Sequence, residues 1–238
     1  MCTLTFIPKT AVEFIITSNR DEAVVRKTIP PRAYIQDGIK LLFPKDELAG
    51  GTWIGASSKK RLICLLNGGF KPHVRKSEYR KSRGIVVTDL LKADTTVTAI
   101  EAYDLIDIEP FTIVTVDWSE KLKLYQLVWD GSKKHFSELN SNSPHIWSAA
   151  MLYTDEMKAL RKDWFTSFLK EKNLHPEALL DFHKNAGIGN QNTDLQIDRG
   201  FLKTVSITQI HKKNERIDVH YENLLNGEVA KSTEHFSG

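Results

Sequence analysis

Residues 1–22, MCTLTFIPKTAVEFIITSNRDE, contain two apolar runs that favour β-structure, separated by a short polar segment. The runs are Leu4–Ile7 and Val12–Ile16, and Pro8–Thr10 predicts a turn between them. A tight hairpin returns the end of its second strand to the start of its first. We therefore expect the polar string Asn19–Glu22 to lie beside Cys2.

Residues brought together in this way suit nucleophilic catalysis at a chain terminus. If Met1 is removed, the α-amine of Cys2 has an ordinary pKa of about 7.7–8.0 and is a base beside the thiol. A nearby cation such as Arg20 lowers the pKa of a cysteine thiol, which is about 8.5 when unperturbed. Asp21 is a candidate to orient the α-amine, as the third group of a catalytic triad orients its base.

Each of these features also has a structural explanation. A small residue at position 2 is common because it permits removal of the initiator methionine. The string Asn19–Glu22 alone is typical of a polar loop with a helix N-cap. The joint occurrence of both features, with a hairpin between them, favours a shared site, but it leaves open whether that site catalyses a reaction.

The combination of Met1–Thr3 with Asn19–Glu22 resembles the NRDE family, also called the transport and Golgi organisation protein 2 family. The resemblance continues at Gly50–Gly55 and at Leu65–Asn67. More distantly, the chain is similar to the choloylglycine-hydrolase type of N-terminal-nucleophile (Ntn) hydrolase. That resemblance implies a four-layer αββα sandwich in which an N-terminal cysteine cleaves amide bonds.

The resemblance also implies roles for individual residues. Cys2 is implied as the nucleophile, with Arg20 and Asp21 positioning its thiol and amine, and with Asn19 and Glu22 as supporting residues.

Asn67 ends an apolar strand, at a place comparable to one where the related enzymes form part of their oxyanion hole. It is therefore a candidate for the same role. A glycine turn at Asn67-Gly68-Gly69 without any catalytic role explains the sequence equally well.

Two positions depart from the pattern of the related sequences. Ala149 stands where many relatives have an asparagine, and in the hydrolases that asparagine donates to the oxyanion. Loss of one such donor lowers rates about 10²–10³-fold. Asn140 and Asn142 are candidates to replace it. Lys203, with Arg199 further away, stands near a position usually occupied by arginine, whose planar fork a lysine does not reproduce.

Composition and charge are those of a globular protein. The chain has 238 residues, of which 41% are hydrophobic and 26% charged. The net charge of +3 at pH 7 is too small to indicate a nucleic-acid partner. The most basic segment, residues 71–83, is expected to be a solvated loop, with the rim of an anion-binding site as the alternative.

The two cysteines, Cys2 and Cys64, predict neither a disulfide framework nor a zinc site. Cys64 lies in an apolar run and is expected to be a buried, unreactive thiol. The start of the chain lacks the features of a signal peptide, and no run reaches the roughly 20 apolar residues of a membrane helix. We therefore expect a cytoplasmic protein that acts on a small-molecule substrate or ligand; the sequence gives no oligomeric state.

The predicted order of elements is strands, two helices, strands, two helices and strands. The predicted strands cover residues 4–7, 12–16, 39–43, 52–55, 61–67, 111–116, 121–129, 145–150, 204–210 and 216–221, and the predicted helices 82–91, 97–106, 154–168 and 176–185. The loop around Pro30-Pro31 and the tail from Asn226 are expected to lack regular structure. The third helix is expected to bury a stripe of Met157, Leu160, Trp164 and Phe168. This order favours an α+β fold in one domain, residues 1–238.

Two functions remain open at this point. The first is an Ntn-type cysteine amidohydrolase that cleaves a non-peptide carbon–nitrogen bond or a thioester, with Cys2 as nucleophile and its α-amine as base. The second is a non-catalytic binding or trafficking protein on the same fold, for haem or a lipid-like acyl ligand. Because the sequence contains no Cys-x-x-Cys-His motif, any haem would be held non-covalently.

Overall fold

A hairpin begins the described part of the chain in the computed structural model, which covers residues 3–172 and 174–236. β1 (Thr3–Thr10) pairs antiparallel with β2 (Glu13–Ala23), which confirms the predicted hairpin. The turn lies at Ala11-Val12 and not at Pro8–Thr10. Pro8 stays in the strand beside a register shift, where its missing N–H is tolerated. Both strands are therefore longer than predicted, and the string Asn19–Glu22 lies inside β2.

β1 and β2 belong to a six-stranded antiparallel sheet with the order β10-β1-β2-β11-β12-β13. Its other members are β10 (His145–Ser148), β11 (Leu202–Lys213), β12 (Arg216–Asn223) and β13 (Val229–His235). β2 and β11 pair over nearly their whole lengths, so the two ends of the chain meet in this sheet. The prediction of an irregular tail beyond Asn226 is wrong, because residues 229–235 pair with β12.

The second sheet has seven antiparallel strands in sequence order. They are β3 (Thr28–Gln36), β4 (Ile39–Asp46), β5 (Ile54–Ser57), β6 (Arg61–Asn67), β7 (Phe111–Asp117), β8 (Lys123–Trp129) and β9 (Lys134–Leu139). β3 corrects the expectation of a loop around Pro30-Pro31. The two prolines lie at a register shift in an edge strand, where no neighbour needs their N–H groups. β9, the other edge strand, was not predicted.

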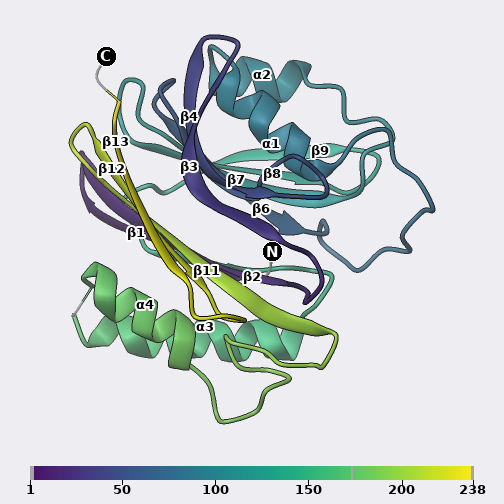
Figure 1. The fold of residues 1–238 in the computed structure, drawn as a ribbon, viewed down its shortest axis with the longest axis vertical. Helices are drawn as coiled ribbons and strands as arrows, with labels where there is room; N and C mark the ends of the chain where they lie inside the picture. Colours follow the sequence, from purple (N-terminus) through teal and green to yellow (C-terminus); the bar gives the residue numbers. More distant parts are fainter. Residues whose placement is uncertain (1–2, 173, 237–238) are drawn as a thin grey trace.

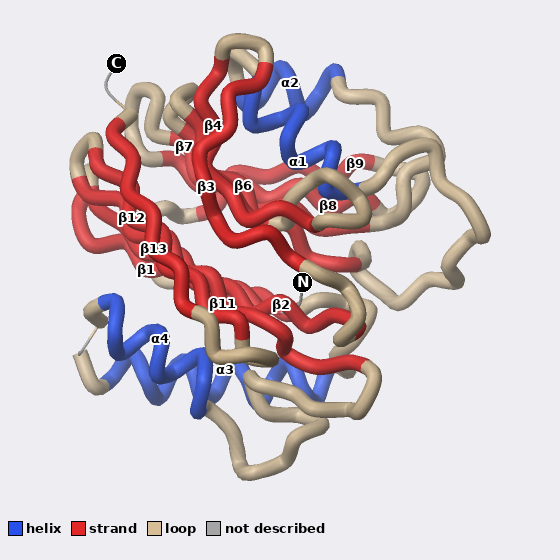
Figure 2. Tube along the Cα trace, viewed as in Figure 1, coloured by secondary structure: helices blue, strands red, loops and turns tan. Residues whose placement is uncertain are grey.

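Two helices cover the outer face of each sheet (Figure 1). α1 (Arg83–Lys92) and α2 (Thr96–Ala102) lie over the second sheet, and α3 (Asp155–Lys170) and α4 (Pro176–Asn185) lie under the first. The layers are separated clearly when the chain is coloured by secondary structure (Figure 2). The fold is therefore the predicted αββα sandwich. Within the described residues, no helix combines the length and the apolar character needed to cross a membrane.

The space between the two sheets holds the larger hydrophobic core. Leu4, Phe6 and Ile16 enter it from the first sheet, and Val114 is among the residues that enter from the second. These residues are fully buried, and β-branched and aromatic side chains predominate because they pack well on a pleated surface.

A second cluster joins the first sheet to α3 and α4. It contains Ile7, Ile15, Phe165, Phe168, Leu179, Phe182 and Leu195. The predicted stripe on α3 is only partly right. Phe168 is buried, but Leu160 is 38% exposed, and the helix turns Arg161 and Phe165 inward. Arg161 is accommodated because polar partners lie beneath the helix, as described below.

The first turn of α1 lies directly against the segment that precedes β5. The Thr52 N–H donates to the Gly84 carbonyl at 3.3 Å, and a Cβ atom added to Gly51 would lie 2.3 Å from the Gly84 carbonyl carbon. We predict that Gly51→Ala lowers the free energy of unfolding by about 2–3 kcal/mol, because two backbone segments must separate. Urea unfolding followed by tryptophan fluorescence measures this loss.

Gly200→Ala is the matched control for this substitution. Gly200 has a φ of +77° and open space around it, so the variant suffers only left-handed backbone strain, about 1 kcal/mol. Equal losses in the two variants would contradict the close approach of α1.

Candidate active site

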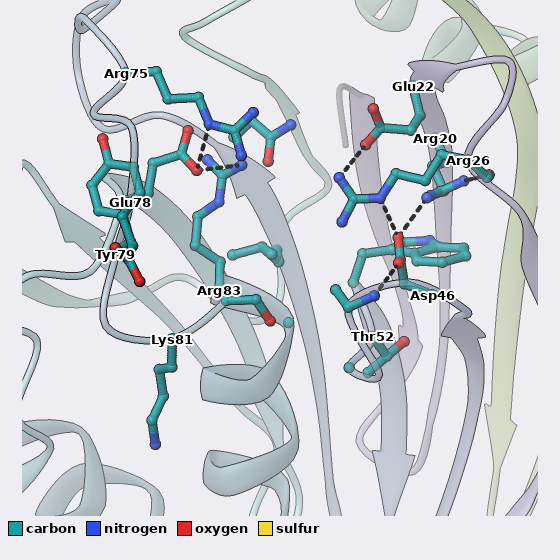
Figure 3. A pocket seen from close by; sticks show the side chains of 18 of the residues that line it. Arg20, Glu22, Arg26, Asp46, Thr52, Arg75, Glu78, Tyr79, Lys81 and Arg83 are labelled. Atoms are coloured by element: carbon teal, nitrogen blue, oxygen red, sulfur yellow. Dashed lines mark hydrogen bonds and ion pairs between the residues drawn. The ribbon is translucent and has the colours of Figure 1, made fainter.

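A cavity of about 360 Å³ opens between β2 of the first sheet and the second sheet (Figure 3). One wall carries residues of β2, β4 and the segment before β5. The opposite wall carries the loop that leads into α1. Most of the lining side chains are polar or charged: Arg20, Glu22, Arg26, Asp46, Thr52, Asn67, Arg75, Ser77, Glu78, Tyr79, Lys81, Ser82, Arg83 and Glu109. The cavity therefore suits a polar group better than an apolar one.

Asp46 forms ion pairs with two arginines of the first wall. Its Oδ2 accepts from Arg20 Nη2 at 2.8 Å and from Arg26 Nε at 2.7 Å, and Arg26 also lies 3.6 Å from Glu22. Arg20 is 3% exposed, and its guanidinium lies 4.5 Å from the centroid of the Trp53 ring. Burial lowers the pKa of Arg20, and the charges of Glu22 and Asp46 oppose that shift. The pair ties β2 of one sheet to β4 of the other.

Glu109 organises the opposite wall. It lies 3.2 Å from Arg83 and 3.8 Å from Arg75, and burial lowers the pKa of the Arg83 guanidinium. The basic segment 71–83 is a mostly exposed loop, as expected, and its residues Arg75, Ser77–Tyr79 and Lys81–Arg83 also line the cavity. Lys81 points away from this centre and pairs with Asp89 at 3.0 Å (Figure 3).

Two side-chain donors at the cavity have no partner in the described part of the chain. They are the Trp53 indole N–H and the Ser82 hydroxyl, and both atoms are shielded from solvent. Ser82 occupies the predicted N-cap position of α1, but its side chain makes no capping hydrogen bond. A buried polar atom without a partner is rare in folded proteins, so these two groups are candidate hydrogen-bond donors to a ligand in the cavity.

Asn67 lines the same cavity at the end of β6, half-buried. The glycine turn after it is also present, since Gly68 has a φ of +88°. The Gly68 N–H donates to the Pro110 carbonyl at 3.1 Å, so this backbone amide is already used. Asn67 itself lines the cavity, so it stays the candidate oxyanion donor at this strand end.

The string Asn19–Glu22 is divided between the two faces of β2. Arg20 and Glu22 line the cavity, whereas Asn19 and Asp21 face α3 and α4. Successive side chains of a strand point to opposite faces, so the four residues cannot share one volume. Cys2 lies outside the described residues. Thr3, which follows it, pairs with Asn19 of β2 and with Ser148 of β10.

Asn19 belongs to a buried polar network beneath the sheet. Its amide nitrogen donates to the carbonyls of His183 and Leu195, so its Oδ1 accepts from His183 Nδ1 at 2.6 Å. The other ring nitrogen of His183 contacts Thr5 Oγ1 at 2.8 Å. Burial, and to a smaller extent the charge of Arg161, lower the pKa of His183 to about 3, so the ring is neutral at pH 7.

Asp21 accepts two hydrogen bonds in the same layer. The Tyr153 hydroxyl donates to Oδ2, and the Thr204 hydroxyl donates to Oδ1 at 2.6 Å. Asp21 is 1% exposed. It is thus held rigidly on the helix side of β2, one residue from Arg20 on the cavity side.

The positions that depart from the family pattern do not line the cavity. Ala149 is buried, and Lys203 pairs with Asp198 at 2.8 Å. Arg199 donates to backbone carbonyls of other segments. Asn140 forms a local turn by donating to Ser143, away from the cavity lining. Within residues 3–172 and 174–236, no group of three or more His, Cys, Asp or Glu side chains is placed to hold a metal ion.

Several cavity residues were missed by the sequence analysis. Asp46 and Glu109 carry no local signal, because their partners are distant in the chain. Trp53 lies in the segment Gly50–Gly55 that carries part of the resemblance, and Arg83 ends the basic segment, so signals for these two existed.

Comparison with known proteins identifies sequence and fold relationships. The sequence matches the family described as Transport and Golgi organisation 2 over residues 1–227. No curated protein matches it. Among solved structures, the chain is similar to penicillin V acylase from Agrobacterium tumefaciens, with a TM-score of 0.61 and 12% identity over 97% of this chain and 85% of that chain.

Two further solved structures show the same likeness. One is the Caenorhabditis elegans ortholog of N-acylethanolamine-hydrolyzing acid amidase, with a TM-score of 0.59 and 14% identity over 88% of this chain and 92% of that chain. The other is a variant of the conjugated bile acid hydrolase from Clostridium perfringens, with a TM-score of 0.55 and 12% identity over 100% of this chain and 94% of that chain. The fold is therefore that of the Ntn hydrolases.

The ion pair at the cavity generates a prediction about stability. Asp46→Asn leaves Arg20 buried without its carboxylate, so we expect a loss of about 3 kcal/mol in the free energy of unfolding. Asp94→Asn is the control, because Asp94 pairs with Lys59 while 90% exposed, and we expect no resolvable change in the free energy of unfolding. Chemical unfolding measures both variants, and similar losses in their free energies of unfolding would contradict the importance of the buried pair.

His183 generates a prediction about pH. Its pKa of about 3 in the folded protein is below the ordinary value of 6.5, so the unfolded chain binds more protons between these values. Its contribution to stability is complete above pH 6.5 and is lost as the pH falls toward 3. The slope is about 1.4 kcal/mol per pH unit. His183→Gln should reduce the slope of the free energy of unfolding against pH by up to that amount. His235→Gln, at an exposed position, should leave this slope unchanged. Identical pH profiles of unfolding for the wild type and His183→Gln would refute this.

Proposed function

Because the chain belongs to the Transport and Golgi organisation 2 family and has the Ntn-hydrolase fold, we propose that it is an N-terminal-cysteine amidohydrolase. After removal of Met1, the Cys2 thiol attacks the carbonyl of a non-peptide amide or a thioester, and the α-amine takes the thiol proton. The same amine, now protonated, gives a proton to the leaving group, and water then hydrolyses the acyl-cysteine.

The single observation that carries this proposal is the polar cavity lined by Arg20 of β2, the strand that pairs with β1. Leu4 and Phe6 face the space between the sheets, whereas Thr3 and Thr5 contact the helix layer. Arg20 lines the cavity from β2, one residue along from Asn19, which pairs with Thr3. A thiol there would have a cation beside it, which lowers a cysteine pKa.

The lining residues supply candidate groups for the rest of the reaction. Asn67 and the Trp53 indole N–H are donors for the oxyanion or for another acceptor of the substrate. Asp21, held by Tyr153 and Thr204, is proposed to orient the α-amine. Glu22 and Asn19 support the site by fixing Arg26 and the helix layer, respectively.

The lining also bears on the nature of the ligand. Ala49 and Leu65 are its aliphatic side chains and Trp53 and Tyr79 its aromatic ones, so haem or an acyl chain would meet more polar than apolar side chains. A carrier of such ligands is therefore not favoured, and a substrate with a polar group at the scissile end fits better. Cys64 is a buried free thiol, which supports the proposal of a reducing, cytoplasmic location.

Hydrolysis assays with matched cysteine variants test the proposed function. Penicillin V, an N-acylethanolamine and a bile-acid conjugate are suitable probes, because the three similar enzymes are named for them. We expect the wild type to cleave at least one, and Cys2→Ala to lose at least about 10³-fold in kcat. Cys64→Ala should keep its rate per folded molecule, since burial raises the pKa of Cys64 to about 12. Turnover that persists in Cys2→Ala, or no cleavage of any probe, contradicts the proposal.

A further inference from the structure

Arg161 of α3 is fully buried and contacts the first described residue of the chain. Its Nη1 donates to Thr3 Oγ1 at 2.6 Å. Its Nη2 donates to the Asp194 carbonyl at 2.6 Å, and Nε and Nη2 both donate to the Thr193 carbonyl at 3.3 and 3.2 Å. All three guanidinium nitrogens are therefore engaged, and the planar group is held in one orientation.

The same guanidinium is linked to Asp21 through a tyrosine. The Arg161 Cζ atom lies 3.4 Å from the centroid of the Tyr153 ring, and the Tyr153 hydroxyl donates to the Asp21 carboxylate. One buried cation thus fixes Thr3 directly and supports Asp21 through the aromatic ring. Thr3 directly follows Cys2 in the chain, and Asp21 is the residue proposed to orient the α-amine of Cys2.

The charge of Arg161 is hard to explain by packing alone. No carboxylate in the described residues lies within ion-pair distance of it, and its partners are a hydroxyl, two carbonyls and a ring. An apolar side chain at the same place would avoid the desolvation penalty of a buried cation. What the guanidinium adds is a fixed, directional hydrogen bond to the end of β1.

We propose that Arg161 is a positioning residue that clamps Thr3 and thereby holds the reactive end of the chain at the cavity. This inference rests on the proposed function. Displacement of a reacting group by about 1 Å can lower a rate about 10²-fold. Loss of the clamp should therefore slow the reaction of Cys2 by more than the accompanying loss of folded protein explains.

The test compares two threonines on the same face of β1. Thr3→Val removes the acceptor of Arg161, and Thr5→Val, the matched control, removes the contact with His183. Both residues are fully buried, and both substitutions nearly conserve volume. Thr3→Ser keeps the hydroxyl. Each protein is treated with limiting iodoacetamide, and the alkylation rate of Cys2 is read by peptide mass in the fraction that lacks Met1.

We expect Thr3→Val to alkylate at Cys2 at least about tenfold more slowly than wild type, and Thr3→Ser to recover most of the rate. Thr5→Val should stay within about twofold of wild type at a comparable decrease in Tm. Equal rates for Thr3→Val and Thr5→Val, or no recovery in Thr3→Ser, would overturn the clamp and leave the proposed function intact. A wild-type Cys2 that reacts no faster than the buried Cys64 would overturn both.

Discussion

Strand β2 is buried on both faces, and this constraint divides its polar side chains between two environments. Arg20 and Glu22 face the space between the sheets, and Asn19 and Asp21 face the helix layer. An extended strand cannot direct neighbouring side chains to one side. The string therefore builds a cavity wall above the sheet and a polar support beneath it. The proposed nucleophile, Cys2, directly precedes Thr3, which pairs with Asn19 of β2 at this point.

Each buried polar group on β2 depends on partners from distant parts of the chain. Arg20 is matched by Asp46 of the other sheet, Asn19 by His183 of α4, and Asp21 by Tyr153 before α3. Unpaired buried polar groups are strongly unfavourable, so these partners also fix the register of β2 and the position of the layer formed by α3 and α4. The resulting rigidity is what a preorganised site requires, since donors held in place need no reorganisation during reaction.

Local patterns predicted most of the fold, and long-range contacts account for what they missed. Apolar runs such as Arg61–Asn67 and the proline at the start of α4 gave strands and helices close to their observed bounds. The segment around Pro30-Pro31 became a strand because a sheet edge tolerates prolines. Arg161 was placed outside the predicted buried stripe because its polar partners lie in other segments.

At the candidate site too, sequence patterns predicted local features and missed long-range pairs. Asn67 and Arg20 were found from sequence because they sit in recognisable strings, and both line the cavity. Asp46 and Glu109 were not found, since nothing local marks a carboxylate whose role is to pair with a distant arginine. The shared volume expected for Arg20 and Asp21 is wrong, because β2 continues through both residues and directs their side chains to opposite faces.

The proposed function depends on a nucleophile at residue 2. Mass spectrometry of the N-terminal peptide, after an acid quench during reaction with p-nitrophenyl acetate, tests this most directly. The account predicts a peptide that begins at Cys2 and carries one acetyl group, with the Cys64 peptide unmodified. A peptide that still begins with Met1, or acetyl groups found only on lysines, would contradict it.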